Sequence, residues 1–259
     1  MNAKQIYDEK ITRLNKAFNK KTPDRIPIMP NIETWMYHYA GISLKDAFTK
    51  SPDLLFEGIK KFTDDVYVDG IFGVSNSVPV KMFERTGNSL YVITEDSLQT
   101  KGGAGHTMKA DEYPLLTQDP ISFFANRILP RKYPVFMQEP EKNLVLLRQL
   151  NEDFKAFGQY NGSVVKRVRE ELGMPVLTKT ATYVVPDIIL DYLRDFVGVV
   201  RDIKKNGEAY LQSCLSLYEM TIQMLCDSGV LADEHGFIFS PLHLPTFLNK
   251  KDFAKYYLP

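Results

Sequence analysis

The feature that most constrains the fold of this chain is the alternation of short β-prone runs with longer stretches of helical periodicity. Four such runs lie at residues 26–30, 65–69, 174–178 and 236–239. Their length and their bounding Pro, Gly and polar residues are typical of buried strands. Pro27 and Pro30 place the first run at a strand end or an irregular edge. Strands that alternate with helices predict a parallel α/β arrangement.

Helices are expected between and beyond these runs. Residues 3–19 carry apolar side chains at helical spacing, and Ser51 with Pro52 forms a favourable helix start. Further helices are predicted at residues 33–40, 43–49, 119–128, 139–171 (with a break near Asn161-Gly162), 186–196, 206–228 and from 249 or 250 onward. Cys214 and Cys226 both fall in the helix at 206–228. They lie twelve residues apart, a rise of ~18 Å that excludes a disulfide on one straight helix.

The stretch at about 76–135 departs from the alternating pattern. Short β-prone runs and the cluster Gly102 to Gly105 indicate an antiparallel hairpin within residues 90–110. We therefore expect one α/β-barrel domain over residues 1–259 with an inserted hairpin and helical region. Four strands cannot close a barrel of eight, so unpaired strand edges are expected to meet a second copy or a missing half.

Composition excludes several classes of function. Lys plus Arg and Asp plus Glu both number 32, whereas nucleic-acid binders carry a basic surplus. No apolar run reaches the ~18 residues that a membrane helix needs. The charged N-terminal segment does not resemble a signal peptide, so a cytoplasmic location is expected.

Several segments share a pattern with a known family. They are Pro23 to Ile28, Asp65 to Asp69, Pro175 to Leu177 with Tyr192-Leu193, and Phe239 to His243 followed by Phe253 and Pro259. In this order they resemble the uroporphyrinogen decarboxylase superfamily along the whole chain. The resemblance implies a (β/α)8 TIM barrel of that type, of which the N-terminal half with about four strands is present.

One departure from the family pattern bears on the reaction. True uroporphyrinogen decarboxylases carry an arginine-rich loop after the first strand, but Met29 to Trp35 contains no arginine. Arginine has the geometry to bind the many carboxylates of the porphyrinogen. The chain therefore looks closer to the corrinoid-linked methyltransferases of the superfamily. In those relatives zinc is held by residues on later strands, beyond this chain.

The barrel rule places an active site at the C-terminal ends of the strands. Asp69 ends the second run, and the family's matching aspartate meets the pyrrole N–H groups. The alternative is that Asp69 accepts backbone N–H bonds in a turn. His243, just after the fourth run, is a candidate acid, base or ligand, or a histidine hydrogen-bonded in a loop. Tyr192 is a candidate donor to a developing anion, or a core residue.

Four further residues are candidates for substrate binding. Asn31 and Trp35 follow the first run, and Thr178 and Lys179 end the third. Trp35 could stack on a flat cofactor such as a corrin, with core packing as the alternative. His38, His106 and His235 are weaker candidates, and the glycine cluster fits a hairpin tip better than a phosphate site.

Three hypotheses of function follow. The first is a methyltransferase that moves a methyl group between a corrinoid (cobalamin) on a partner protein and a small acceptor. The second is a uroporphyrinogen III decarboxylase, a carboxy-lyase of tetrapyrrole metabolism. The third is a non-catalytic half-barrel that needs a partner chain.

Overall fold

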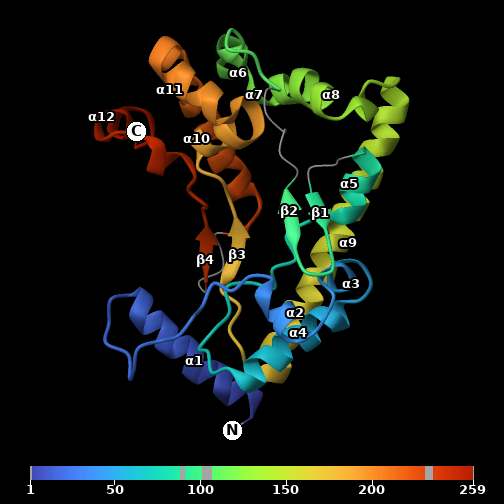
Figure 1. Cartoon of the computed structure of the whole chain (residues 1–259), viewed down its shortest axis with the longest axis vertical. Helices are drawn as coiled ribbons and strands as arrows, with labels where there is room; N and C mark the ends of the chain where they lie inside the picture. Colours follow the sequence, from blue (N-terminus) through green and yellow to red (C-terminus); the bar gives the residue numbers. More distant parts are fainter. Residues whose placement is uncertain (1, 88–90, 101–106, 231–235, 259) are drawn as a thin grey trace. The chain divides into compact units, whose positions relative to one another are not determined.

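The computed structural model describes residues 2–87, 91–100, 107–230 and 236–258. The chain is a mixed α/β protein that is mostly helical, and its described strands form two open sheets of two strands each (Figure 1). A closed barrel sheet is not seen in the described residues. Among the described helices, none combines the length and apolar character needed to cross a bilayer.

Two of the four predicted runs are not strands, which corrects the prediction of four core strands. Residues 26–30 are extended without strand pairing, in keeping with two prolines that lack an N–H donor. Helix α4 (Pro52–Asp65) runs into the second run, and Val66 caps it. The fourth run contains β4 (Phe237–Phe239). The third run overlaps β3 (Thr178–Ala181) only at Thr178, and within residues 174–177 only Val176 forms an isolated bridge.

The chain divides into two compact units, where a single domain was predicted. Unit 1 comprises residues 1–100 and 140–178, and unit 2 comprises residues 101–139 and 179–259. Each unit has its own cluster of buried hydrophobic side chains. Part of the predicted insertion therefore belongs to unit 1 and part to unit 2.

Unit 1 is built around the long helix α9 (Pro140–Leu172), which contacts α1 (Ala3–Phe18), α4 and α5 (Val80–Thr86). Helices α2 (Trp35–Tyr39) and α3 (Leu44–Thr49) pack against α4. Local sequence explains the helix starts, because Asn2, Ser43 and Ser51 each accept a backbone N–H bond. The predicted break near Asn161-Gly162 is wrong, since α9 continues through it.

Three extended segments of unit 1 lie side by side in chain order. Asp69 N donates to Ile28 O at 2.7 Å, and Ile71 N donates to Pro175 O at 2.9 Å. Ile71 and Val176 form a parallel bridge. A Cβ at Gly70 would lie 3.1 Å from Leu14 Cδ1 and 3.3 Å from Pro175 O, which explains a glycine there. The first three predicted runs are thus neighbours, although their pairing is too sparse to form a sheet.

An antiparallel hairpin is present in unit 1 within the predicted range, but its turn lies at Thr94 to Ser97 and not at the glycine cluster that was predicted as a hairpin tip. Strands β1 (Tyr91–Ile93) and β2 (Leu98–Thr100) pair antiparallel, with Val92 opposite Gln99. The connecting turn is closed by Thr94 N, which donates to Ser97 O at 2.9 Å. The glycine cluster at 102–105 and His106 lie outside the described residues, as does His235.

Unit 2 is organised by α11 (Asp195–Asp227), which contacts α6 (Tyr113–Gln118), α7 (Pro120–Phe123), α10 (Val185–Ile188), η3 (Ile189–Arg194) and α12 (Lys250–Tyr256). η1 (Phe124–Ile128), α8 (Leu129–Lys132), η2 (Pro134–Phe136) and η5 (Leu244–Phe247) complete its helices in the described residues. Non-helical torsions at Asn206 kink α11, where the sequence predicted a second helix to begin. The arrows of β3 and β4 point the same way in Figure 1.

The two cysteines differ in environment. Cys214 is buried in the core of unit 2, and burial raises the pKa of its thiol to about 12. Cys226, on the same helix, is exposed. Only Cys214 therefore matches the prediction of a buried small hydrophobic residue.

An acid-sensitive ion pair lies in unit 2. The Arg131 guanidinium bonds both carboxylate oxygens of Glu112, at 2.6 and 2.7 Å, and lowers the pKa of that carboxyl to about 2. A carboxyl with a depressed pKa stabilises the fold above its unfolded pKa, near 4.5, and this contribution is lost as pH falls toward 2. We expect Glu112→Gln to cost about 1.5–3 kcal/mol at pH 7 and much less near pH 2. Urea unfolding across this pH range measures the difference.

Glu139→Gln, at an exposed residue of the same unit, is the matched control and should leave the stability within ~0.5 kcal/mol at either pH. Equal effects of Glu112→Gln at pH 7 and near pH 2 would show that the ion pair is not responsible.

Candidate functional site

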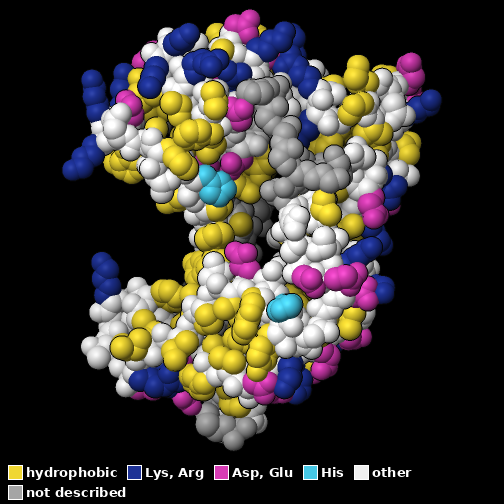
Figure 2. Space-filling model, viewed as in Figure 1, with side chains coloured by type: hydrophobic (Ala, Val, Ile, Leu, Met, Phe, Trp, Pro, Cys, Tyr) yellow, Lys and Arg dark blue, Asp and Glu magenta, His cyan; other side chains and the backbone are white. Residues whose placement is uncertain are grey.

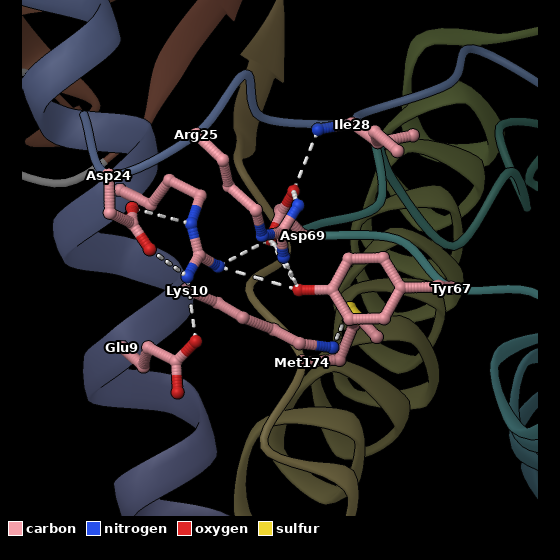
Figure 3. Close-up of polar contacts among 9 residues, drawn as sticks. Glu9, Lys10, Asp24, Arg25, Ile28, Tyr67, Asp69 and Met174 are labelled. Carbon is pink, nitrogen blue, oxygen red and sulfur yellow. Dashed lines mark hydrogen bonds and ion pairs between the residues drawn. The ribbon is translucent and has the colours of Figure 1, made fainter. Parts of the chain in front are cut away.

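The Asp69 carboxylate lies at the centre of a buried polar cluster in unit 1 (Figure 3). Oδ1 accepts bonds from Arg13 Nη1 at 2.7 Å, Tyr67 Oη at 2.7 Å and Arg25 Nη2 at 2.9 Å. Oδ2 accepts bonds from the Ile28 amide at 2.7 Å and from Arg25 Nη1 at 3.2 Å. The side chain is 0% exposed, so protein donors replace the water that its charge has lost.

Arg13 extends this cluster toward the surface. Its guanidinium is 3% exposed and also bonds Asp24 Oδ1 and Oδ2, at 2.8 and 2.6 Å, and Glu9 at 2.7 Å. The bond to Arg13 lowers the pKa of Asp24 to about 2. Burial lowers the pKa of the neighbouring Lys10, whose ammonium lies 5.4 Å from the centre of the Tyr67 ring.

The Asp69 cluster comprises Glu9, Lys10, Arg13, Asp24, Arg25, Tyr67 and Asp69. In it three acidic residues face three basic ones. The cluster joins α1, the turn at residues 24–28 and the segment that ends at Asp69. This geometry favours a structural role for Asp69. The sequence offered as one alternative that Asp69 accepts a backbone N–H bond, and the Ile28 amide donates such a bond. A catalytic role for Asp69 stays a prediction.

Two of the predicted substrate-binding residues line one hollow of about 450 Å³ in unit 1. The described lining residues are Asn31, Ile32, Glu33, Thr34, Trp35, His38 and Asp96. The hollow is shallow and largely open to solvent, although its volume is in the range of small-molecule sites. Asn31 and Trp35 are therefore brought together, and the weaker candidate His38 joins them.

Trp35 presents an accessible aromatic surface in this hollow. Its side chain is 48% exposed, and its ring lies 5.2 Å from that of Tyr39 and 6.0 Å, edge to face, from that of Phe62. The carboxylates in the lining belong to Glu33 and Asp96, and the described lining includes no lysine or arginine. Figure 2 shows Asp and Glu side chains beside hydrophobic ones over the region of α2 and α3. This surface suits a neutral or cationic ligand better than a polyanion.

Thr178 and Lys179 do not line this hollow. The Thr178 hydroxyl is buried without a hydrogen-bond partner among the described residues, while its backbone N donates to Phe72 O at 3.0 Å. Lys179 belongs to unit 2, within β3.

His243, in unit 2, pairs with a carboxylate that the sequence interpretation missed. Its Nδ1 lies 2.8 Å from Asp191 Oδ2, and the imidazole is 49% exposed. Burial raises the pKa of Asp191. An imidazole oriented by a carboxylate can transfer protons near neutral pH.

The backbone at His243 is held by a second carboxylate. Asp187 is 0% exposed and accepts bonds from His243 N at 3.1 Å, Leu244 N at 2.8 Å and Tyr257 Oη at 3.0 Å. Asp187 and Asp191 are four residues apart, which is a helical spacing that could have indicated a shared face.

Tyr192, also in unit 2, is half-buried among other side chains. Its ring lies 5.2 Å from that of Tyr183, edge to face, and 5.0 Å from Lys132 Nζ. Burial lowers the pKa of Lys132. The position of Lys132 beside the Tyr192 ring is compatible with both alternatives for Tyr192, a packing residue or a hydrogen-bond donor to an anion.

The predicted site residues are thus divided between the two units: Asp69, Asn31, Trp35 and Thr178 in unit 1, and His243, Tyr192 and Lys179 in unit 2. Within the described ranges no group of three or more His, Cys, Asp or Glu side chains could hold a metal ion. No protein-family model matches the sequence, and the searches of curated proteins and of solved structures found no similar protein.

Proposed function

We propose that this chain is part of a methyltransferase with a uroporphyrinogen-decarboxylase-type scaffold. It would move a methyl group between a corrinoid on a partner protein and a small acceptor. The acceptor would bind in the hollow lined by Asn31 and Trp35, which we call the Trp35 hollow. The observation that carries the proposal is the lining of that hollow, with an exposed indole, two carboxylates and no described lysine or arginine. Its volume of about 450 Å³ fits a small acceptor rather than a whole corrin.

The order of extended segments in unit 1 supports the scaffold. The segments at Ile28, at Asp69 to Ile71 and at Pro175 to Leu177 are neighbours in chain order, with a parallel bridge between the last two. Such neighbours with helices between them are expected at the start of a parallel α/β barrel. The resemblance of the sequence motifs to the superfamily points the same way.

The charge of the hollow argues against a decarboxylase of a polycarboxylate. Carboxylates of the substrate would meet Glu33 and Asp96 without a described basic lining residue to offset them. Arg25, the nearest arginine in the sequence, is engaged with Asp69. A neutral or cationic acceptor avoids this repulsion.

Trp35→Ala tests the proposal. Loss of the ring contact, worth ~1–1.5 kcal/mol, should raise the KM of the acceptor about tenfold with little change in kcat. Trp35→Phe should recover much of the affinity. Methyl transfer is followed by the absorbance change of methylcobalamin, with thiol and folate acceptors and the full-length protein.

The control variant is Phe154→Ala, which removes an exposed aromatic side chain of the same unit outside the hollow. Absence of methyl transfer with every acceptor would contradict the proposal, and release of carbon dioxide from uroporphyrinogen would favour the decarboxylase. No turnover in either assay, with a change of mass when a second polypeptide is added, would favour the non-catalytic half-barrel.

A further inference from the structure

A second hollow of unit 1 lies between α1 and α9, two helices that contact each other. Its volume is about 570 Å³, and one side of it is open to solvent. Helix α1 contributes Lys4 and Tyr7 to the described lining, and α9 contributes residues within 162–170. None of these residues lines the Trp35 hollow or belongs to the Asp69 cluster, so the two helices form a separate surface here.

The lining of this hollow carries an excess of positive charge. Lys4, Lys166 and Arg169 stand against a single described carboxylate, that of Glu170, which leaves a formal charge of +2. Among the described residues, neither lysine has an ion-pair partner, and Glu170 has none either. The adjacent Arg167 differs, because it bonds Glu171 at 2.8 Å and a second carboxylate at 2.7 Å. The charge of the hollow is therefore not neutralised by the described protein groups around it.

The backbone holds Arg169 in place at the edge of this hollow. Its Nη2 donates to Val176 O at 3.0 Å, and the side chain is half-buried. Its Nε is buried without a partner among the described residues, so it is turned away from any ligand. Its Nη1 also lacks a described partner but is not buried. Nη1 is thus the accessible donor of a guanidinium that is already oriented.

The hollow also offers contact for an uncharged part of a ligand. The Tyr7 ring and Val165 line it, and Val165 packs against the hydrophobic core of unit 1. The Tyr7 hydroxyl has no described partner and is not buried, so it is a further accessible donor. Gly162 adds no side chain, and a Cβ placed on it would meet no atom within 4 Å. This part of the lining has room for an organic group.

The start of α1 adds to the positive potential. Lys4 lies in the first turn of this helix, and that turn contains no acidic residue. The N-terminal end of a helix carries a partial positive charge, which favours anions and disfavours cations there. A lysine in this turn therefore costs helix stability, and a bound anion would offset that cost.

We propose that this hollow, which we call the Lys166 hollow, binds a small organic phosphate monoester. The charge of such a phosphate, about −1.5 to −2 at pH 7, matches the formal charge of +2 on the lining. Its oxygens would accept bonds from Lys4, Lys166 and Arg169 Nη1, and its organic group would contact the Tyr7 ring. The site is independent of the methyl-transfer proposal, because it uses other residues.

Titration calorimetry of the whole protein with phenyl phosphate, at low ionic strength, tests the site. We expect a Kd in the millimolar range or tighter. Benzyl alcohol keeps the ring but lacks the charge, and it should not bind in that range. Inorganic phosphate keeps the charge but lacks the ring, and it should bind at least about threefold more weakly than phenyl phosphate. Equal binding of benzyl alcohol and phenyl phosphate would overturn the proposal.

Lys166→Gln removes one of the three positive charges of the lining at an exposed position. It should weaken the binding of phenyl phosphate at least about fivefold. Lys155→Gln is the matched control, because Lys155 is exposed on the same helix but does not line the hollow. This control should bind phenyl phosphate as the wild type does.

Gly162→Leu tests the space of the hollow rather than its charge. The leucine side chain would occupy room that the ligand needs and should weaken binding at least about tenfold. Glycine disfavours a helix interior, so the Tm should be no lower than that of the wild type. Gly158→Leu, four residues earlier with equally open surroundings, is the control. No binding of phenyl phosphate in the millimolar range, or wild-type binding by both Lys166→Gln and Gly162→Leu, would contradict the site.

Discussion

Asp69→Asn is expected to lower the free energy of unfolding by about 3–5 kcal/mol. The substitution keeps the shape of the side chain but removes the charge that two arginines face at 2.7 and 2.9 Å. Arg13 is 3% exposed and cannot recover its hydration, so the cluster would retain a buried positive charge without its central partner. Urea unfolding followed by circular dichroism measures the change.

Asp65→Asn is the matched control for this substitution. Asp65 lies four residues before Asp69 and bonds Lys61 at 2.6 Å and Tyr39 at 3.0 Å, but it is at the surface. Exposed pairs contribute ~0–1 kcal/mol, so a small effect is expected. Stability and turnover measured on Asp69→Asn also distinguish a structural role of Asp69 from a catalytic one. Unchanged stability with lost turnover would support a catalytic carboxylate and contradict the structural role.

Asp202→Asn is expected to destabilise unit 2 by a similar amount, about 3–5 kcal/mol. Asp202 is 2% exposed and accepts bonds from Arg194 Nε at 2.6 Å, Arg194 Nη2 at 3.2 Å and Tyr113 Oη at 2.9 Å. Arg194 also donates to Met108 O at 2.6 Å. Loss of the carboxylate charge leaves the buried Arg194 guanidinium without an anionic partner among the described residues.

The control is Asp227→Asn, at the exposed C-terminal end of α11, which should change stability by no more than ~0.5 kcal/mol. Thermal and urea unfolding of both variants test the prediction. A loss below ~1 kcal/mol in Asp202→Asn would mean that solvent reaches Arg194, and would contradict its buried pairing.

Features that depend on neighbours in sequence were predicted well. Ser51 and Pro52 begin α4, the hairpin at 91–100 forms, and the last helix begins at Lys250. Asn31 and Trp35 line one hollow because they are only four residues apart, and their role in substrate binding stays a prediction. Each of these outcomes follows from local hydrogen bonding or from short chain separation.

Features that depend on distant segments were predicted less well. Residues 26–30 and 65–69 have strand-like composition, but strand pairing requires a partner of matching length, and these segments share few backbone bonds. His243 and Asp191 are 52 residues apart in sequence, and no local sequence pattern predicts their contact.

The sequence by itself determined the mixed α/β character of this protein and the start of most helices, because caps, turns and periodicity act over a few residues. Only the tertiary structure decided that the chain forms two units and that Asp69 is enclosed by arginines. Those outcomes depend on which segments exclude water from one another, and desolvation is a property of the packed chain rather than of any short stretch of it.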